Sequence, residues 1–130
     1  MAAHVVHLGD RPNLEETVDR LGGQELASGP KSTRFLGLPG EDFVNPHKPP
    51  YAYFLERPAG DITPEHCHDA NRLEFVVEGK IEWRERGAEP VVYGSGTLTY
   101  VDAGTTYGYT VLEDAKILIV FESPPGMHYG

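Results

Sequence analysis

The sequence predicts a single antiparallel all-β domain, a sandwich or a barrel, with one short helix near the N-terminus. Short apolar runs typical of strands recur between turn residues along most of the chain. The 15 glycines and 11 prolines stand mostly where turns are needed. The chain has 130 residues, which is a usual length for one domain with a sizeable core. We therefore treat residues 1–130 as one domain.

The N-terminal part is expected to hold a strand over residues 3–8 and then a short helix within residues 10–23. Pro12 suits the first helical turn, and the glutamates that follow it favour the positive end of the helix dipole. Gly22-Gly23 ends the helix. This helix is too short and too isolated to form repeated strand–helix–strand units, which favours an antiparallel sheet.

The rest of the chain is expected to consist of strands. They are predicted at 32–38, 51–57, 72–79, 80–86, 90–93, 97–101, 107–111 and 115–122. Glu78-Gly79 predicts a hairpin turn between the third and fourth of these strands. A loop rich in glycine and proline is expected over residues 39–50, and the tail from Ser123 is expected to be a loop or an arm.

Composition excludes several classes of function. The net charge is −9, and 11 Lys and Arg against 20 Asp and Glu do not supply the basic face that binds nucleic acid. No apolar run approaches the 18 residues or so that a membrane span needs, and the N-terminus lacks the pattern of a signal peptide. The single cysteine, Cys67, excludes an intrachain disulfide and fits a reducing compartment. We expect a cytoplasmic protein.

Two histidines in the stretch "TPEHCHDANRLEFVVEGKIEW" are the first candidates for chemistry. His66 and His68 stand two residues apart, so on an extended chain both side chains face the same side. That spacing lets two imidazoles meet one ion, and neutral imidazole suits zinc, iron, nickel or copper. The alternative is a pair of histidines that contact a substrate in a polar pocket without any metal.

The spacing around these histidines resembles that of the cupin family, whose members are small jelly-roll or double-stranded β-helix barrels. The family's first motif has glycine, five residues, His-x-His, three or four residues, glutamate, six residues and glycine. Gly60, His66, His68 and Gly79 fall on that frame. The resemblance implies a cupin-type barrel with its core at about residues 32–122.

The second cupin motif has glycine, five residues, Pro-x-Gly, two residues and histidine. Gly96, the segment 102–104 and Tyr107 fall on it. The two motifs together with the segment between them cover roughly residues 50–121. Cupins are commonly dimers, and the expected strand over residues 3–8 is an exposed edge that pairing would cover, so we expect a homodimer.

The departures from the two motifs matter for the metal. Arg72 occupies the glutamate position when one counts back from Gly79, and Tyr107 replaces the last histidine. In the family two histidines, the glutamate and that last histidine hold a divalent metal. Only His66 and His68 carry over, so the resemblance implies half of a metal site. A divalent transition metal (iron, zinc, nickel or manganese) and no cofactor at all both remain open.

Three further residues are candidate catalytic groups. Glu74 lies two residues after Arg72 and should face the same side, where it could complete a two-histidine, one-carboxylate site or pair with Arg72. Arg72 stays cationic, cannot ligate a metal, and could hold a carboxylate or an enolate of the substrate. Tyr107 is suited to donate a proton or a hydrogen bond to a substrate oxygen, unless it is only a wall residue.

Other residues give weaker signals. Tyr53 and Tyr109 could line the same cavity, and His47 could lie over the barrel mouth or simply be solvated. Because Arg72 is the one cation expected inside, the sequence does not favour a phosphate-bearing ligand. The aromatic residues of the strands favour a hydrophobic or ring-bearing substrate.

We therefore expect a small-molecule enzyme whose active site is the interior of a cupin barrel. Metal-assisted chemistry of the dioxygenase, cyclase or isomerase type on a hydrophobic or aromatic oxygenated substrate is the first hypothesis. The alternative is a metal-free cupin. It would be either a small-molecule binding or sensor module, or an acid–base enzyme of the dehydratase or isomerase kind that uses histidine and tyrosine.

Overall fold

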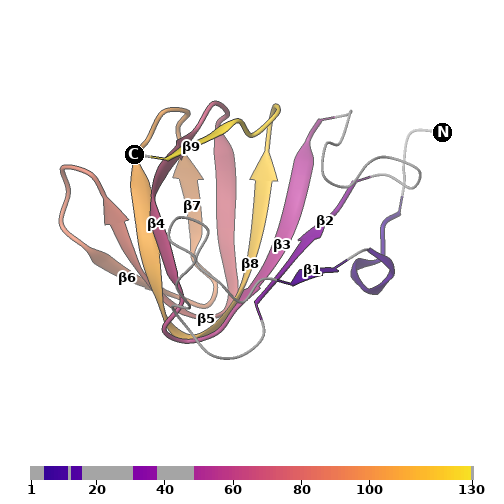
Figure 1. Cartoon of the computed structure of the whole chain (residues 1–130), viewed down its shortest axis with the longest axis horizontal. Coiled ribbons are helices and arrows are strands. Elements are labelled where there is room, and N and C mark those ends of the chain that lie inside the picture. The colour runs from indigo at the N-terminus through magenta and orange to yellow at the C-terminus, as the bar shows by residue number, and fades with distance from the viewer. Residues whose placement is uncertain (1–4, 12, 16–30, 38–48, 130) are drawn as a thin grey trace.

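The computed structural model describes residues 5–11, 13–15, 31–37 and 49–129 of the chain. Its elements in chain order are η1 (Leu8–Asp10), β1 (Asn13–Glu15), β2 (Ser32–Phe35), β3 (Tyr51–Arg57), β4 (Ile62–His68), β5 (Arg72–Glu85), β6 (Val91–Gly94), β7 (Leu98–Val101), β8 (Tyr107–Phe121) and β9 (Met127–Tyr129). The strands form one antiparallel sheet that curls strongly upon itself (Figure 1). The predicted all-β class and the jelly-roll type of barrel are confirmed.

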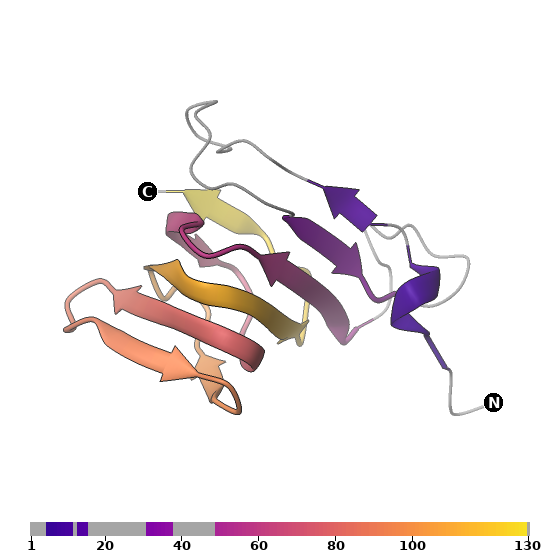
Figure 2. The ribbon, with the colours of Figure 1, turned by 90° about the horizontal axis from the view of Figure 1, so that it is seen from below.

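Two long strands, β5 and β8, run through both halves of the curled sheet. They pair from Arg72 opposite Phe121 to Glu85 opposite Tyr107. In one half their neighbours are β7 on the β5 side and β3, β2 and β1 on the β8 side. In the other half the neighbours are β6 on one side and β4 and β9 on the other. The two halves face each other in Figures 1 and 2 and enclose the core.

The bend between the two halves lies where the sequence predicted a hairpin. β5 does not reverse at Glu78-Gly79 but continues, with register shifts against β8 at this point. Gly79 has φ +91°, and a Cβ there would stand 2.3 Å from the carbonyl oxygen of Asp114. The predicted hairpin and the predicted break over residues 112–114 are therefore wrong. Glycine signals here a bend and a close approach of two strands rather than a turn.

The N-terminal predictions are corrected in detail. Residues 5–7 form no strand, and a 3-10 turn lies at Leu8–Asp10. The helix predicted within residues 10–23 is not formed by residues 13–15, the part of it that the structure describes as a regular element. Asn13–Glu15 is a strand that pairs with β2, and residues 16–30 lie outside the described residues. Pairing with the sheet edge thus outweighs the local helix signals. The homodimer stays a prediction, but the strand 3–8 that was to mediate it is not formed by its described residues.

The remaining strands follow the sequence more closely. The strand predicted at 51–57 is confirmed without change, and those at 32–38, 90–93 and 97–101 are confirmed within a few residues. The tail differs, since β9 pairs with β4. The loop over 39–50 lies outside the described residues except for its last two positions.

The buried side chains lie between the two halves of the sheet. Large fully buried residues include Tyr107, Phe121, Ile117 and Val111, all on β8. Burial alternates along β5 and β8, as expected for strands with one face on the core. The first half of β5 therefore points Arg72 and Glu74 inward. In the part of the chain that the structure describes, no helix has the length and apolar character to cross a membrane.

Candidate active site

A cavity of about 290 Å³ lies between the two halves of the barrel. This volume is at the lower end of the range for small-molecule sites. Its aromatic and aliphatic wall comes from β2, β3 and β8, and includes Phe35, Tyr53, Leu55, Tyr109, Ile119 and Phe121. Tyr53 and Tyr109 thus line the cavity, as the sequence suggested. Apolar and aromatic walls of this kind bind hydrophobic or ring-bearing compounds.

His66 and His68 both border this cavity from the end of β4. Their rings lie 4.9 Å apart between centroids because the two residues alternate on an extended strand. Nδ1 of His66 lies 2.8 Å from the carbonyl oxygen of Pro64. A carbonyl oxygen only accepts, so Nδ1 carries the proton in the neutral ring and Nε2 carries the lone pair.

His68 is buried, and its ring packs against the ring of Phe121 at 5.0 Å between centroids. Burial, together with the positive charge of Arg72, lowers the pKa of His68 to about 3. The imidazole is therefore neutral at pH 7. Its Nδ1 atom is buried and has no hydrogen-bond partner within the described residues. Buried polar atoms are normally satisfied, so an unsatisfied one in a cavity wall is a natural contact for a ligand.

Arg72, Glu74 and Tyr107 form a buried cluster beside the histidines. Nε of Arg72 donates to Oε2 of Glu74 at 3.2 Å, and the guanidinium carbon lies 4.4 Å from the centre of the Tyr107 ring. Burial raises the pKa of Tyr107 well above 10, and the charge of Glu74 raises it further. The phenol therefore keeps its proton and donates its hydrogen bond to Glu74. Burial also raises the pKa of Glu74, against the opposing effect of Arg72.

Tyr107 borders the cavity, whereas Arg72 and Glu74 are not among the described residues that do so. The Tyr107 ring packs against the His66 ring at 4.4 Å and stacks on Trp83 at 4.4 Å between centroids. The ion pair thus lies behind the cavity wall, and the buried Nη1 and Nη2 atoms of Arg72 have no hydrogen-bond partner among the described residues. The catalytic roles that the sequence suggested for these three residues remain predictions.

The donor set does not fit the metal that the cupin motif implies. Glu74 is engaged by Arg72 and by Tyr107, and the cation of Arg72 disfavours a dication nearby. Among the described residues, no group of three or more His, Cys, Asp or Glu side chains is arranged to hold a metal ion. Two imidazoles alone fall short of the three protein ligands that a catalytic zinc site uses. His47, a further candidate ligand, lies outside the described residues.

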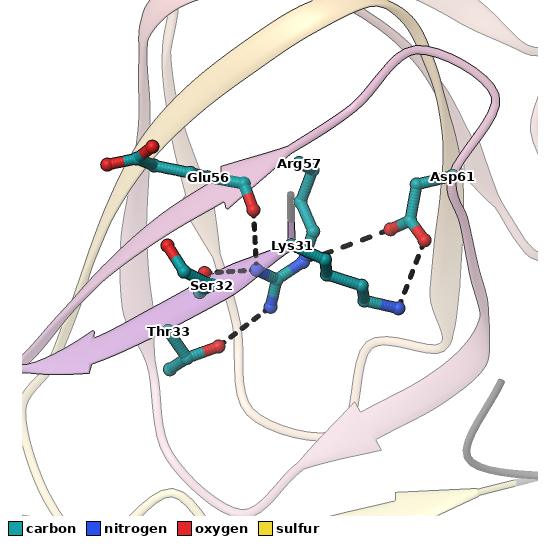
Figure 3. A network of polar contacts seen from close by, with 6 residues as sticks. All are labelled: Lys31, Ser32, Thr33, Glu56, Arg57 and Asp61. Atoms are coloured by element: carbon teal, nitrogen blue, oxygen red, sulfur yellow. Dashed lines mark hydrogen bonds and ion pairs between the residues drawn. The ribbon is translucent and has the colours of Figure 1, made fainter. Parts of the chain in front are cut away.

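A second polar cluster borders the same cavity and was missed by the sequence reasoning (Figure 3). Arg57, at the end of β3, donates to the backbone carbonyls of Ser32 and Glu56 and, at 2.8 Å, to Oγ1 of Thr33. Lys31 and Arg57 share one carboxylate: Asp61 Oδ1 lies 3.0 Å from Nζ of Lys31, and Oδ2 lies 3.8 Å from Nε of Arg57.

These contacts correct the expectation that Arg72 is the cation of the pocket. Lys31 and Arg57 border the cavity, and Arg72 does not. A signal for Arg57 was present, because Tyr53, Leu55 and Arg57 alternate along one strand and must face the same side. No periodic pattern pointed to Lys31, which precedes a short strand.

Comparisons with known proteins agree with this architecture. Residues 53–121 match the sequence profile of the family described as "Cupin domain". None of the curated proteins matches the sequence. The polyketide cyclase RemF from Streptomyces resistomycificus is similar in structure, with a TM-score of 0.69 and 20% identity over 98% of this chain and 84% of the cyclase.

Two more solved structures are similar. An RmlC-like cupin from Shewanella frigidimarina NCIMB 400 gives a TM-score of 0.65 with 17% identity over 93% of this chain and 91% of that chain. The DMSP lyase DddQ from Ruegeria pomeroyi DSS-3 gives 0.61 with 22% identity over 72% of this chain. The match spans about half of the lyase, 47% of its length. At these identities the likeness shows a shared fold.

Proposed function

The chain belongs to the cupin family, whose profile covers residues 53–121 of its 130, and from that premise we propose that it is a small-molecule acid–base enzyme. The substrate is a hydrophobic or aromatic oxygenated compound held in the barrel interior. The observation that carries this proposal is His66, whose tautomer is fixed by the Pro64 carbonyl and whose Nε2 bears the lone pair in the cavity wall. Similar structures named as a cyclase and a lyase are consistent with an enzyme.

His66 is the general base of the proposed reaction. Nε2 takes a proton from a carbon next to a carbonyl, the C–H bond breaks, and its electron pair moves into the enolate, whose oxygen takes the negative charge. Return of the proton to another carbon gives an isomerisation, and loss of a β-hydroxyl as water gives a dehydration. His68 is neutral at pH 7, and its unsatisfied Nδ1 is placed to form one hydrogen bond with the substrate.

Tyr107 positions the base in this scheme. Its ring packs on His66, and its hydroxyl is held by Glu74, which in turn is held by Arg72. A phenol whose pKa is raised by burial is a hydrogen-bond donor rather than a source of protons at pH 7. This chain of contacts supports the metal-free alternative over metal-assisted chemistry. Arg72 and Tyr107, which form part of it, occupy the two motif positions whose side chains would otherwise bind the metal.

The test uses 2-tetralone, a bicyclic ketone whose carbonyl is flanked by acidic benzylic hydrogens. Exchange of these hydrogens in heavy water is followed by proton NMR with wild-type protein, His66→Gln and the control His128→Gln, whose side chain is 60% exposed and pairs with Asp69. We expect exchange above the buffer rate, a loss of at least about a hundredfold in His66→Gln, and no loss in the control. EDTA should leave the rate unchanged.

Two outcomes would contradict the proposal. An exchange rate that does not depend on His66 would remove the base. About one transition metal per chain by elemental analysis, with exchange abolished by EDTA and metal lost in His66→Ala/His68→Ala, would establish the metal-assisted reading instead.

A metal-free binding module is the second candidate. The lowered pKa of His68 favours it, since an imidazole that stays neutral over the physiological range is a constant hydrogen-bonding group and a weak base. This candidate predicts that aromatic ligands bind without any exchange or turnover.

A further inference from the structure

We infer that the end of the cavity formed by Lys31 and Arg57 is a subsite for a carboxylate, so that the ligand of this barrel is an aromatic or otherwise hydrophobic acid. This inference names the substrate class of the proposed enzyme. It rests on the proposed function only for the chemistry at the histidine end of the cavity. The subsite is defined by Lys31, Arg57 and Asp61, and we call it the Lys31 subsite (Figure 3).

The Lys31 ammonium is the first argument. Its side chain is 13% exposed and borders the cavity, and Nζ lies 3.0 Å from Oδ1 of Asp61. An ammonium has three N–H donors, and Asp61 is its one charged or hydrogen-bonding partner within the described residues. A largely buried ammonium with donors to spare favours an additional anionic acceptor from the cavity side.

The second argument is that Arg57 is fixed in place. Its guanidinium donates to two backbone carbonyls and to the Thr33 hydroxyl, all from β2 and β3, and its side chain is 5% exposed. Glu56 contributes its carbonyl, while its carboxylate points away from the guanidinium (Figure 3). Asp61, with 2% exposure, forms ion pairs with both cations, and its Oδ2 has no hydrogen-bond partner among the described residues. The subsite is therefore preorganised: its positive groups stand at the cavity wall before any ligand arrives.

The position of the subsite decides what kind of acid fits. Asp61 directly precedes Ile62, the first residue of β4, and His66 lies four residues further along the same strand. At a rise of about 3.3 Å per residue, the five residue steps from Asp61 to His66 span at most roughly 16 Å, and the irregularity between Thr63 and His66 shortens this span. The wall between the two ends includes the apolar and aromatic residues Leu55, Tyr109 and Ile119. A ring system with a carboxylate at one end and an oxygenated, reacting carbon at the other matches this order.

The experiment compares 2-naphthoate with its uncharged methyl ester, two probes that share the same rings. Affinities are measured by NMR titration in low salt for wild type, Lys31→Met and the control Lys116→Met, a half-exposed lysine that pairs with Glu78 outside the cavity. We expect wild type and Lys116→Met to bind naphthoate at least about tenfold more tightly than the ester. Lys31→Met should bind both probes alike.

Asp61→Asn gives a result of opposite sign and keeps the inference testable if Lys31→Met does not fold. Removing the carboxylate that competes for Lys31 should tighten naphthoate binding and leave ester binding unchanged. Equal affinities for the two probes in wild type, or a preference for the acid that survives in Lys31→Met, would overturn the inference. Tighter binding of 2-naphthyl phosphate than of naphthoate would overturn the assignment to a carboxylate.

These measurements need no turnover, so they are independent of the proposed reaction. His66→Gln should keep the preference for the acid while losing exchange on 2-tetralone. A preference for the acid without any exchange would place the Lys31 subsite in a binding module. Exchange without the preference would leave an enzyme that acts on uncharged compounds.

Discussion

Arg72 and Glu74 form an ion pair, 3.2 Å between Nε and Oε2, in the core of the barrel beside the two cavity histidines. Both side chains are buried, with 0% and 5% exposure. Arg72 stands at the glutamate position of the cupin motif, and Glu74 lies two residues further on. Glu74 thus pairs with the arginine of its own strand, where a cupin carboxylate would bind a metal ion. Tyr107 completes the arrangement by hydrogen bonding to Glu74.

The first prediction concerns the stability of this pair. Arg72→Met leaves a carboxyl group buried without its cation, and should lower the free energy of unfolding by about 3 kcal/mol. The loss stays near the low end of the range for buried pairs because Glu74, with its raised pKa, can take up a proton. The double variant Arg72→Met/Glu74→Leu should recover most of the loss. Urea unfolding measures both, and a double variant as unstable as the single one would contradict the prediction.

The second prediction restores the metal donors. Arg72→Glu/Tyr107→His returns a carboxylate and an imidazole to the two altered motif positions next to His66 and His68. This variant should bind about one zinc ion per chain, with four N and O ligands. Elemental analysis after dialysis against zinc and then buffer measures it. Wild type and each single substitution should retain little zinc, and adding His66→Ala to the double variant should abolish binding. A double variant that binds no zinc would show that Arg72 and Tyr107 are not the reason why the native residues fail to hold a metal.

Much of the candidate site could be predicted from sequence because its spacing is local. His66 and His68 share a face of one strand whatever the fold around them, and Tyr107 falls on a fixed frame from Gly96. The structure brings all three to one cavity. Arg57 and Lys31 could not be assigned in the same way, since their place in the wall depends on which strands neighbour β3 and where β4 begins.

The errors in the fold have a common physical cause. A glycine with positive φ serves a hairpin turn and a strand bend equally well, so Gly79 alone cannot tell which one forms. The choice is made by β8, which approaches too closely for any side chain at this position. Near the N-terminus, local helix signals in residues 13–15 yield to pairing with β2. Both cases are decided by contacts between segments that are distant in the sequence.

The third prediction concerns this bend. Gly79→Ala places a Cβ 2.3 Å from the Asp114 carbonyl oxygen in addition to forcing a left-handed backbone on alanine. Gly87→Ala is the matched control, because φ is +86° there but no atom lies within 4 Å of the added carbon. The control should lose about 1 kcal/mol of stability, the cost of the backbone conformation. Gly79→Ala should lose at least about 2 kcal/mol more in urea unfolding. Equal losses would show that the close approach has no energetic weight.

The fourth prediction is a pH dependence caused by His68. The pKa is about 3 in the folded protein against 6.5 for the free side chain, so between these values the unfolded state binds one more proton. Proton uptake by the unfolded state leaves the free energy of unfolding unchanged above pH 6.5 and lowers it progressively as the pH falls from 6.5 towards 3. The urea midpoint of wild type should therefore drop more steeply below pH 6.5 than that of His68→Gln. The exposed control His128→Gln should follow wild type, and parallel curves for wild type and His68→Gln would contradict the lowered pKa.

The continuity of β5 and β8 through both halves of the barrel has a consequence for unfolding. A barrel made of two sheets joined by separate loops could lose one sheet while keeping the other. Here each half contains part of the same two strands, and these strands are hydrogen-bonded to each other over almost their whole length. Opening one half therefore removes pairing that the other half needs, so the described barrel has no boundary at which partial unfolding can stop. We expect the central amides of both strands to exchange with solvent in one cooperative event, even though they belong to two facing halves of the sheet.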